Sequence, residues 1–309
     1  MSRTPSRLAG LLAGAASLGL LAGCGGSSDD AAGAGSTASA PKVAVVASTN
    51  VYGDIVERIG GDLVDVTSII NDPAQDPHSY EAGTRNQLAL SKAEVVVENG
   101  GGYDDFVDRM LASSNASADV INAVEVSGRT APAGGELNEH VWYDFPAVSR
   151  IADRIAGALS TADPDHAGTF TKNAAAFKKG LGALEDKEAA LKSAHGGEGV
   201  AITEPVPVYL LEASGLVNRT PGEFSEAVEE GDDVSAKVLR ATLDLFSGGK
   251  VKALVHNEQT SDAQTEKVKS AAEAAGVPVV PVTETLPAGK DYLTWMNDNV
   301  DALAEALDK

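Results

Sequence analysis

The sequence predicts an α/β protein of two lobes, each a mostly parallel sheet flanked by helices, bridged by one long α-helix. Three observations favour this fold class. Short β-rich runs alternate with helical patterns on both sides of the middle of the chain, one long helical pattern separates the two regions, and 309 residues are enough for two compact cores.

The chain opens with a segment, residues 1–24, that is expected to be an export signal and not part of the fold. Arg3 and Arg7 precede an apolar run over residues 8–22, which is short for a membrane span. The ending LAGC resembles the bacterial lipobox, in which the cysteine, here Cys24, becomes the acylated first residue of a lipoprotein. The alternative is an incidental cysteine at an ordinary cleavage site.

Residues 25–41, GGSSDDAAGAGSTASAP, predict a flexible tether, because small and polar residues cannot bury enough apolar area to become ordered. Acylation of a lipobox cysteine supplies more than one apolar chain, which is enough for stable attachment to a bilayer. We therefore expect an exported protein that is anchored to the outer face of the cell membrane.

The N-terminal lobe is expected over residues 42–163, where strand and helix patterns alternate and thereby indicate a parallel sheet. Strands are predicted over residues 42–49, 62–69, 93–100 and 118–123. Helices are predicted over residues 51–59, 84–93, 103–114 and 145–162.

The linking helix is expected over residues 164–195. Its helical pattern covers residues 167–194 and stops at HGGEG, and the Asp163-Pro164 step separates it from the preceding helix because proline is favoured at helix starts. A helix of this length spans roughly 45 Å, enough to cross a domain boundary.

The C-terminal lobe is expected over residues 196–309, where the alternation resumes. Strands are predicted over residues 200–203, 251–257 and 277–283. Helices are predicted over residues 208–214, 233–249, 262–276 and 292–309.

Composition excludes several functions. The net charge of −21, without clusters of lysine and arginine, argues against nucleic acid as a partner. A single cysteine excludes internal disulfides and cysteine-based zinc or iron–sulfur patterns. The glycine-rich NGGGYDDF, residues 99–106, lacks the Lys-Ser/Thr of a phosphate-binding loop and is interpreted as a strand-to-helix turn.

Four residues follow predicted strands, where ligands bind in open parallel sheets. His78 and His140 lie in loops after strands of the N-terminal lobe, and Glu204 and Glu284 directly follow strands of the C-terminal lobe. Two imidazoles and two carboxylates suit a divalent transition metal. Taken singly, each residue is more simply a surface histidine or a helix-capping glutamate.

The motifs DPHSYE, TRNQLALSKAEVVVENGGGYDDFVDRM, NEHVWYD, ITEPVPVYLLEASGL and TETLPAGKDYLTWMNDNVDALAEAL resemble the solute-binding proteins of ABC-type zinc and manganese importers, the lipoprotein-receptor-antigen and zinc-uptake receptor family. The resemblance covers essentially everything after Lys42. It implies one Zn²⁺ or Mn²⁺ held between the lobes as transported ligand, no catalysis, and delivery to an ABC permease and its ATPase. We expect a monomer.

The resemblance assigns the metal ligands to His78, His140, Glu204 and Glu284. Relatives commonly have histidine at the position of Glu204 and aspartate at that of Glu284, so the metal-binding motif is richer in oxygen here. This shifts the expectation toward Mn²⁺ without excluding Zn²⁺. The prolines at positions 73 and 77 stiffen the loop that carries His78.

Further assignments stay open. Asn71, Glu139 and Asp144 are candidates for orienting the ligands. His256, with Glu258 close by, could be an accessory ligand, although the resemblance places none there, and His166 and His195 are expected at helix ends. The alternative functions are a metal-dependent hydrolase, which would need an open coordination position and a general base, and an adhesin-like lipoprotein.

Overall fold

The computed structural model describes residues 41–309 except 73–74, 76–79, 82, 115–116 and 134. These residues belong to one compact unit, Pro41–Lys309. The predicted export signal, Cys24 and nearly all of the predicted tether lie outside the described residues, as does His78. Among the helices described, none combines the length and the apolar character needed to cross a bilayer.

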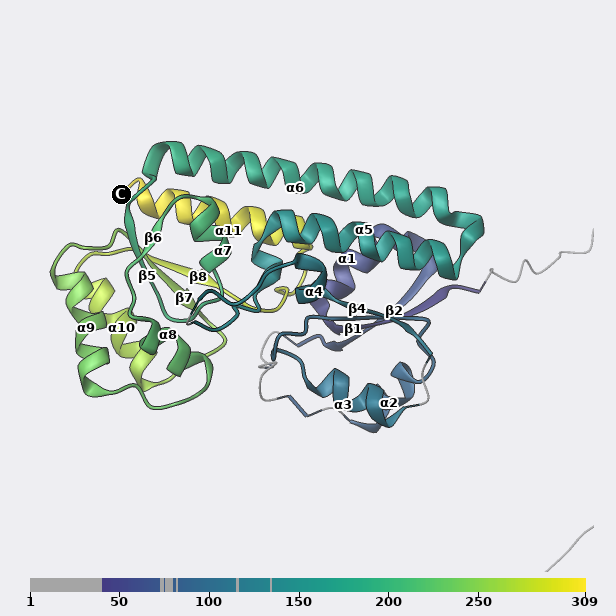
Figure 1. The fold of residues 1–309 in the computed structure, drawn as a ribbon. Helices are drawn as coiled ribbons and strands as arrows, with labels where there is room; N and C mark the ends of the chain where they lie inside the picture. Colours follow the sequence, from purple (N-terminus) through teal and green to yellow (C-terminus); the bar gives the residue numbers. More distant parts are fainter. Residues whose placement is uncertain (1–40, 73–74, 76–79, 82, 115–116, 134) are drawn as a thin grey trace, which may run out of the picture. The chain divides into compact units, whose positions relative to one another are not determined.

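The first sheet has four strands that are all parallel, as predicted, and their order is β2-β1-β3-β4 (Figure 1). Its central strands, β1 and β3, are nearly continuous apolar runs because helices cover both faces of the sheet. The strands are β1 (Val43–Thr49), β2 (Val64–Ile70), β3 (Val95–Glu98) and β4 (Asp119–Asn122). The helices that accompany them are α1 (Asn50–Gly60), α2 (Thr84–Leu90), α3 (Phe106–Ser113), α4 (Ala123–Ser127) and α5 (Phe145–Ala162), with short 3-10 turns at Gly61–Leu63 and Val141–Tyr143.

The second sheet repeats this arrangement, with four parallel strands in the order β6-β5-β7-β8. Its strands are β5 (Gly199–Ile202), β6 (Val217–Asn218), β7 (Leu254–Asn257) and β8 (Val279–Val282). Its helices are α7 (Val208–Ala213), α8 (Gly222–Glu229), α9 (Ala236–Ser247), α10 (Ala263–Ala274) and α11 (Tyr292–Leu307). The sequence did not predict β6, α4 or α8.

Helix α6 (Ala167–His195) has 29 residues and lies along both halves of the fold, after a 3-10 turn at Pro164–His166 (Figure 1). Its buried side chains include Phe170 and Phe177 in the first half and Leu184 and Leu191 in the second. They occupy one side of the helix, which packs against α1, α5 and α11. The predicted long bridging helix is therefore present.

The last helix, α11, is tied to the N-terminal half at its start. The Tyr292 hydroxyl donates to the Trp142 carbonyl (2.5 Å), and the Tyr292 amide donates to Asp54 Oδ2 (2.9 Å). Arg58 pairs with Asp291 across the same junction (2.5 Å). These contacts hold the two halves against each other on the side of the helices.

Candidate metal centre

Three of the four predicted ligands are described, and all three are buried. His140 is 1% exposed and precedes the 3-10 turn Val141–Tyr143, whereas Glu204 and Glu284 are each 2% exposed and lie two residues beyond the ends of β5 and β8. The fourth, His78, falls outside the described residues. Burying a carboxylate is unfavourable unless hydrogen bonds or a cation compensate for the lost water, so the neighbours of Glu204 and Glu284 must supply this compensation.

Glu204 and Glu284 meet at one amide group. The Nδ2 of Asn257 donates to Glu204 Oε2 and to Glu284 Oε1, the latter at 2.7 Å. Asn257 is the last residue of β7, which lies between β5 and β8 in the sheet, so three strand ends converge here. The two carboxylates that the sequence singled out are therefore neighbours.

A contact with Gln259 fixes the orientation of the Asn257 side chain. Its Oδ1 accepts from the Gln259 amide (3.1 Å), which leaves Nδ2 directed to the carboxylates. The Gln259 side-chain oxygen in turn accepts from the amides of Glu284 (2.6 Å) and Thr285 (3.0 Å). Sequence reasoning missed Asn257, although its position at a strand end was the signal that could have identified it.

Tyr103 connects the carboxylates to His140. Its side chain forms a hydrogen bond with Glu284, and burial together with the negative charge of Glu284 raises the pKa of Tyr103. Its ring packs edge-on against His140 (5.9 Å between centroids) and at a tilt against Trp142 (4.8 Å). His140 from the N-terminal half and Glu284 from the C-terminal half therefore contact the same side chain.

The glycine-rich turn before Tyr103 sets its position. Gly100, Gly101 and Gly102 all have positive φ, and a Cβ on Gly100 would lie only 2.1 Å from Asn122 Nδ2. Asp104 closes the turn by accepting from the amides of Asn99 (2.6 Å) and Gly100 (2.7 Å). The predicted strand-to-helix turn thus presents a side chain to the site.

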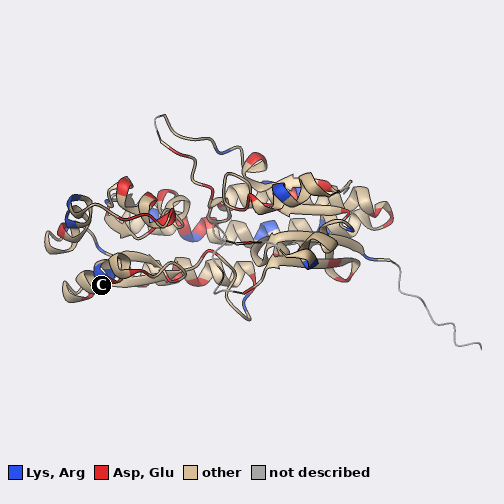
Figure 2. Ribbon diagram, turned by 90° about the horizontal axis from the view of Figure 1, so that it is seen from below, with Lys and Arg blue, Asp and Glu red and all other residues tan. Residues whose placement is uncertain are grey.

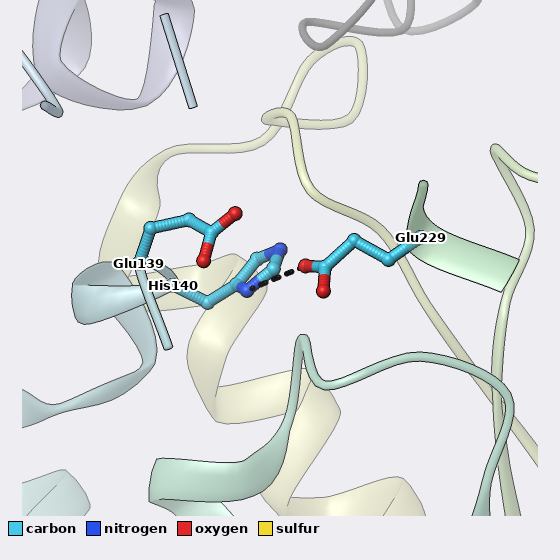
Figure 3. A group of neighbouring side chains, drawn as sticks. All are labelled: Glu139, His140 and Glu229. Carbon is cyan, nitrogen blue, oxygen red and sulfur yellow. Dashed lines mark ion pairs between the residues drawn. The ribbon is translucent and has the colours of Figure 1, made fainter. Parts of the chain in front are cut away.

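His140 also lies between two glutamates, Glu139 and Glu229, as Figure 3 shows. One potential ligand atom from each of the three residues lies within 4.8 Å of the others, and His140 Nδ1 is 3.6 Å from Glu229 Oε1. Glu139 was predicted to lie near the ligands. Glu229 was not predicted at all, because it ends α8, a helix that the sequence pattern did not indicate.

The carboxylates of this region repel one another. Burial, then the charges of Glu139, Glu204 and Glu284, raise the pKa of Glu229 to about 9. Burial is also the main reason that the pKa of Glu139 rises to about 7. A bound dication would favour the charged forms and offset this repulsion.

A cavity of about 480 Å³ lies next to this cluster and has an acidic lining from both halves of the fold. Its glutamates are Glu136, Glu139, Glu226, Glu229 and Glu230. Figure 2 shows acidic residues on both halves of the molecule, with basic residues dispersed among them. The lining therefore suits a small cation better than an anion.

Two of the other candidates have different surroundings. Asp144 pairs with Arg129 (2.6 Å) and caps α5 by accepting from the Ala147 amide (3.4 Å). His256 precedes Asn257 in β7, so the two side chains point to opposite faces of the sheet, and burial and the charge of Lys269 lower the pKa of His256.

The remaining candidates lie apart from the contacts described above. Asn71 is exposed. His166 pairs with Asp163 (2.7 Å), and His195 lies 3.3 Å from Asp308. The aromatic side chains Trp142, Tyr143, Tyr292 and Trp295 pack together in the core, as expected of packing residues.

Known proteins resemble this chain in sequence over most of its length. Over 273 residues the chain is 28% identical to the manganese-binding lipoprotein MntA of Bacillus subtilis, covering 83% of this chain and 82% of the relative. It is 25% identical over 292 residues to the manganese ABC transporter substrate-binding lipoprotein scaA of Streptococcus gordonii, covering 88% and 91%.

Two solved structures extend the likeness to three dimensions. The solute-binding protein FpvC of Pseudomonas aeruginosa, in complex with Mn²⁺, superposes with a TM-score of 0.72 at 26% identity, over 85% of this chain and 98% of that one. The periplasmic zinc-binding protein TroA of Treponema pallidum has a TM-score of 0.74 at 20% identity, over 86% and 99%, and supports the fold alone.

The comparison with protein families agrees with the resemblance noted in the sequence. The model described as "Zinc-uptake complex component A periplasmic" matches residues 45–306. This match covers far more than half of the chain and includes both sheets and the long helix. The chain therefore belongs to the family of periplasmic A components of zinc-uptake complexes.

Proposed function

We propose that this protein is the extracytoplasmic solute-binding component of an ABC importer, which captures Zn²⁺ or Mn²⁺ between its lobes and delivers the ion to a permease that works with an ATPase. The observation that carries the proposal is the shared Asn257 amide, which holds Glu204 and Glu284 together next to Tyr103 and His140. Nitrogen and oxygen donors gathered in a buried place suit a divalent transition metal.

The proposed ligands are His78, His140, Glu204 and Glu284. The named relatives bind manganese or belong to manganese transporters, and the family is named for zinc uptake. Two carboxylates among four ligands favour Mn²⁺ relative to a histidine-rich set, while Zn²⁺ stays above Mn²⁺ in the general order of affinities. Both ions are therefore proposed as cargo.

A transport role accounts for the cluster better than hydrolysis does. The family consists of substrate-binding components of transporters and not of enzymes. Four protein ligands would close the coordination shell of a tetrahedral ion, whereas a catalytic site needs an open position. The hydrolase alternative is not favoured, and no described feature supports the adhesin alternative over transport.

The proposed lobe boundaries follow the elements. Residues 42–163 form the N-terminal lobe, residues 164–195 the linking helix and residues 196–309 the C-terminal lobe. Residues 1–24 are proposed as the signal peptide with its lipobox, which is cleaved before Cys24, and residues 25–41 as the tether. The relatives named above are lipoproteins, which supports acylation of Cys24, attachment to the outer face of the cell membrane, and a monomer that reaches its permease in the plane of the bilayer.

Metal binding is tested on the full-length chain, purified in detergent and stripped with a chelator. Titration calorimetry with Zn²⁺ and with Mn²⁺ should give one saturable site. His78→Ala, His140→Ala, Glu204→Gln and Glu284→Gln should each weaken binding by more than the roughly 10- to 100-fold that loss of an outer partner costs.

His166→Ala is the matched control, because its imidazole pairs with Asp163 and lies outside the proposed ligand set. Its affinity should equal that of the unmodified chain. Absence of saturable binding of either ion would end the transport proposal, and a variant with unchanged affinity would remove that one residue from the ligand set.

Membrane attachment is tested separately. Cells that express the chain should incorporate labelled fatty acid into it, and the protein should sediment with membranes. Cys24→Ser should abolish both results while leaving the metal affinity unchanged. Release of the unmodified chain into the soluble fraction, without label, would contradict the lipid anchor, and light scattering in detergent decides whether the protein is a monomer.

A further inference from the structure

Asn138 lies directly beside His140 and contacts it twice. Its Oδ1 accepts from the His140 backbone amide (3.0 Å) and lies 2.8 Å from the ring nitrogen Nδ1. On its other side, Nδ2 donates to the carbonyl of Pro205 (3.1 Å). Pro205 follows Glu204. The Asn138 side chain therefore connects His140 in the N-terminal lobe to the segment of the C-terminal lobe that carries Glu204.

These contacts fix which end of the Asn138 amide faces which neighbour. A backbone N–H can only donate and a carbonyl can only accept, so rotation of the amide by half a turn would place donor against donor at His140 and acceptor against acceptor at Pro205. Oδ1 therefore faces His140. Because Oδ1 can only accept, the nitrogen Nδ1 beside it must carry the hydrogen.

A second oxygen near this nitrogen, from Glu229, has the same effect. Glu229 Oε1 lies 3.6 Å from Nδ1, farther than Asn138 Oδ1 but also an oxygen. In a neutral imidazole one nitrogen donates and the other accepts, so a hydrogen on Nδ1 leaves the lone pair on Nε2. Metal-bound histidines are commonly oriented in this way by a hydrogen bond to the opposite nitrogen.

We infer that Asn138 is a positioning residue that holds His140 as its Nδ1–H tautomer, presents Nε2 for metal binding, and ties this imidazole to the segment that carries Glu204. The metal-binding part of this inference rests on the proposed function, whereas the tautomer does not.

A second hydrogen bond also links Asn138 to the C-terminal lobe. The backbone carbonyl of Asn138 accepts from the Tyr209 hydroxyl (2.6 Å), and the guanidinium of Arg129 lies 4.4 Å from the centre of the Tyr209 ring. Arg129 also pairs with Asp144 (2.6 Å), at the start of α5. Asn138 is thus held through its backbone as well, and replacing its side chain leaves this second contact in place.

The tautomer can be read directly in the metal-free protein. Nitrogen-15 spectra of the full-length chain, labelled at histidine and stripped of metal, distinguish a protonated ring nitrogen from one with a lone pair. The pH is raised until the ring-nitrogen signals no longer change, so that the ring is neutral. The His140 signals are assigned by their loss in His140→Gln. The unmodified chain should show Nδ1–H.

Three variants separate the roles of Asn138. Asn138→Leu removes the side-chain contacts to both His140 and Pro205, whereas Asn138→Asp keeps an acceptor for His140 but cannot donate to Pro205. Tyr209→Phe, the matched control, removes only the bond to the Asn138 carbonyl. We expect the Nδ1–H tautomer to persist in Asn138→Asp and Tyr209→Phe and to lose its dominance in Asn138→Leu. The affinity for Zn²⁺ should fall about 10- to 100-fold in Asn138→Leu, with partial recovery in Asn138→Asp.

Two results would overturn the inference: an Nε2–H tautomer in the unmodified chain, or an unchanged Nδ1–H tautomer in Asn138→Leu. If Asn138→Leu does not fold, as judged by circular dichroism, an Nε2–H tautomer in Asn138→Asp has the same force. If the unmodified chain binds neither Zn²⁺ nor Mn²⁺, the proposed function fails, and the spectra of the metal-free protein still decide whether Asn138 sets the tautomer.

Discussion

At the scale of single residues, the ligand candidates were easier to predict than the groups that hold them. Glu204 and Glu284 follow strands, which made them candidates, and the family resemblance then selected them together with His140. Asn257 and Asn138 act through hydrogen bonds to residues remote in the sequence. Such bonds depend on strand order and lobe packing, which a residue pattern does not contain.

Asn257 is expected to determine how closely the two carboxylates approach each other. Asn257→Leu keeps the size of the side chain but removes the shared donor, so the affinity for Zn²⁺ should fall about 10- to 100-fold, as measured by competition with a chelating dye. Asn297→Leu, on α11, removes an amide that contacts Lys187 and Asp301 and should leave the affinity unchanged. Equal affinities for both variants would show that Asn257 has no such role.

Glu188, on the buried side of α6, is expected to make the metal-free protein less stable as the pH rises. Burial, then the charges of Glu185 and Asp144, raise its pKa from 4.5 to about 8, and among the described residues its Oε1 has no hydrogen-bond partner. The folded state therefore holds the proton more tightly than the unfolded state, and stability decreases as the pH rises from about 4.5 to about 8.

Glu188→Gln removes this titration while keeping the shape of the side chain. At pH 8 the variant should be more stable by an amount on the order of 2 kcal/mol, and the difference should shrink as the pH falls toward 5, where both side chains are neutral when folded. Urea unfolding at a series of pH values, with chelator present, measures the difference. A constant difference across this range would mean that Glu188 does not titrate as described.

At the scale of helices and strands, the periodicity of apolar residues predicted an element well wherever that element was long or strongly periodic. The long helix, the first sheet and α11 all appear within a few residues of their predicted bounds. Strand β6 has only two residues, too few to show alternation, and α8 begins at the glycine of a Pro-Gly step, which is typical of a turn. Missing α8 is the reason that Glu229 was also missed.

One helix start offers a direct test of local stability. Asp262 caps α10 by accepting from the amides of Gln264 (2.8 Å) and Thr265 (2.6 Å), and the Thr265 hydroxyl accepts from the Asp262 amide (2.8 Å). Asp262→Ala should lower the free energy of unfolding by about 1 kcal/mol, whereas Asp262→Asn should change it little. Thermal unfolding of the metal-free chain measures both. Equal losses in the two variants would assign the effect to charge and not to capping.

At the scale of the whole molecule, the two sheets are separate but their apolar cores are not. One cluster of buried side chains includes Val45 of β1, Val200 of β5, Phe177 of α6 and Trp295 of α11. The sequence predicted two lobes and a bridge, and it did not indicate that α11 returns to pack beside α1 and the long helix. That return depends on the Arg58–Asp291 and Asp54–Tyr292 contacts, which join residues more than 200 positions apart in the chain.

A continuous core of this kind predicts cooperative unfolding of both lobes. Two lobes joined only by a helix would unfold in two steps, whereas loss of one part of the shared cluster exposes apolar surface in the other. Urea unfolding of the metal-free chain should therefore give one transition, with the same midpoint by far-ultraviolet circular dichroism and by tryptophan fluorescence. Tyr292→Phe, which removes the bond to the Trp142 carbonyl, should shift that midpoint downward without splitting the transition. Separate midpoints for the two signals in the unmodified chain would show that the lobes unfold independently, and the shared cluster would then contribute little to the stability of the whole.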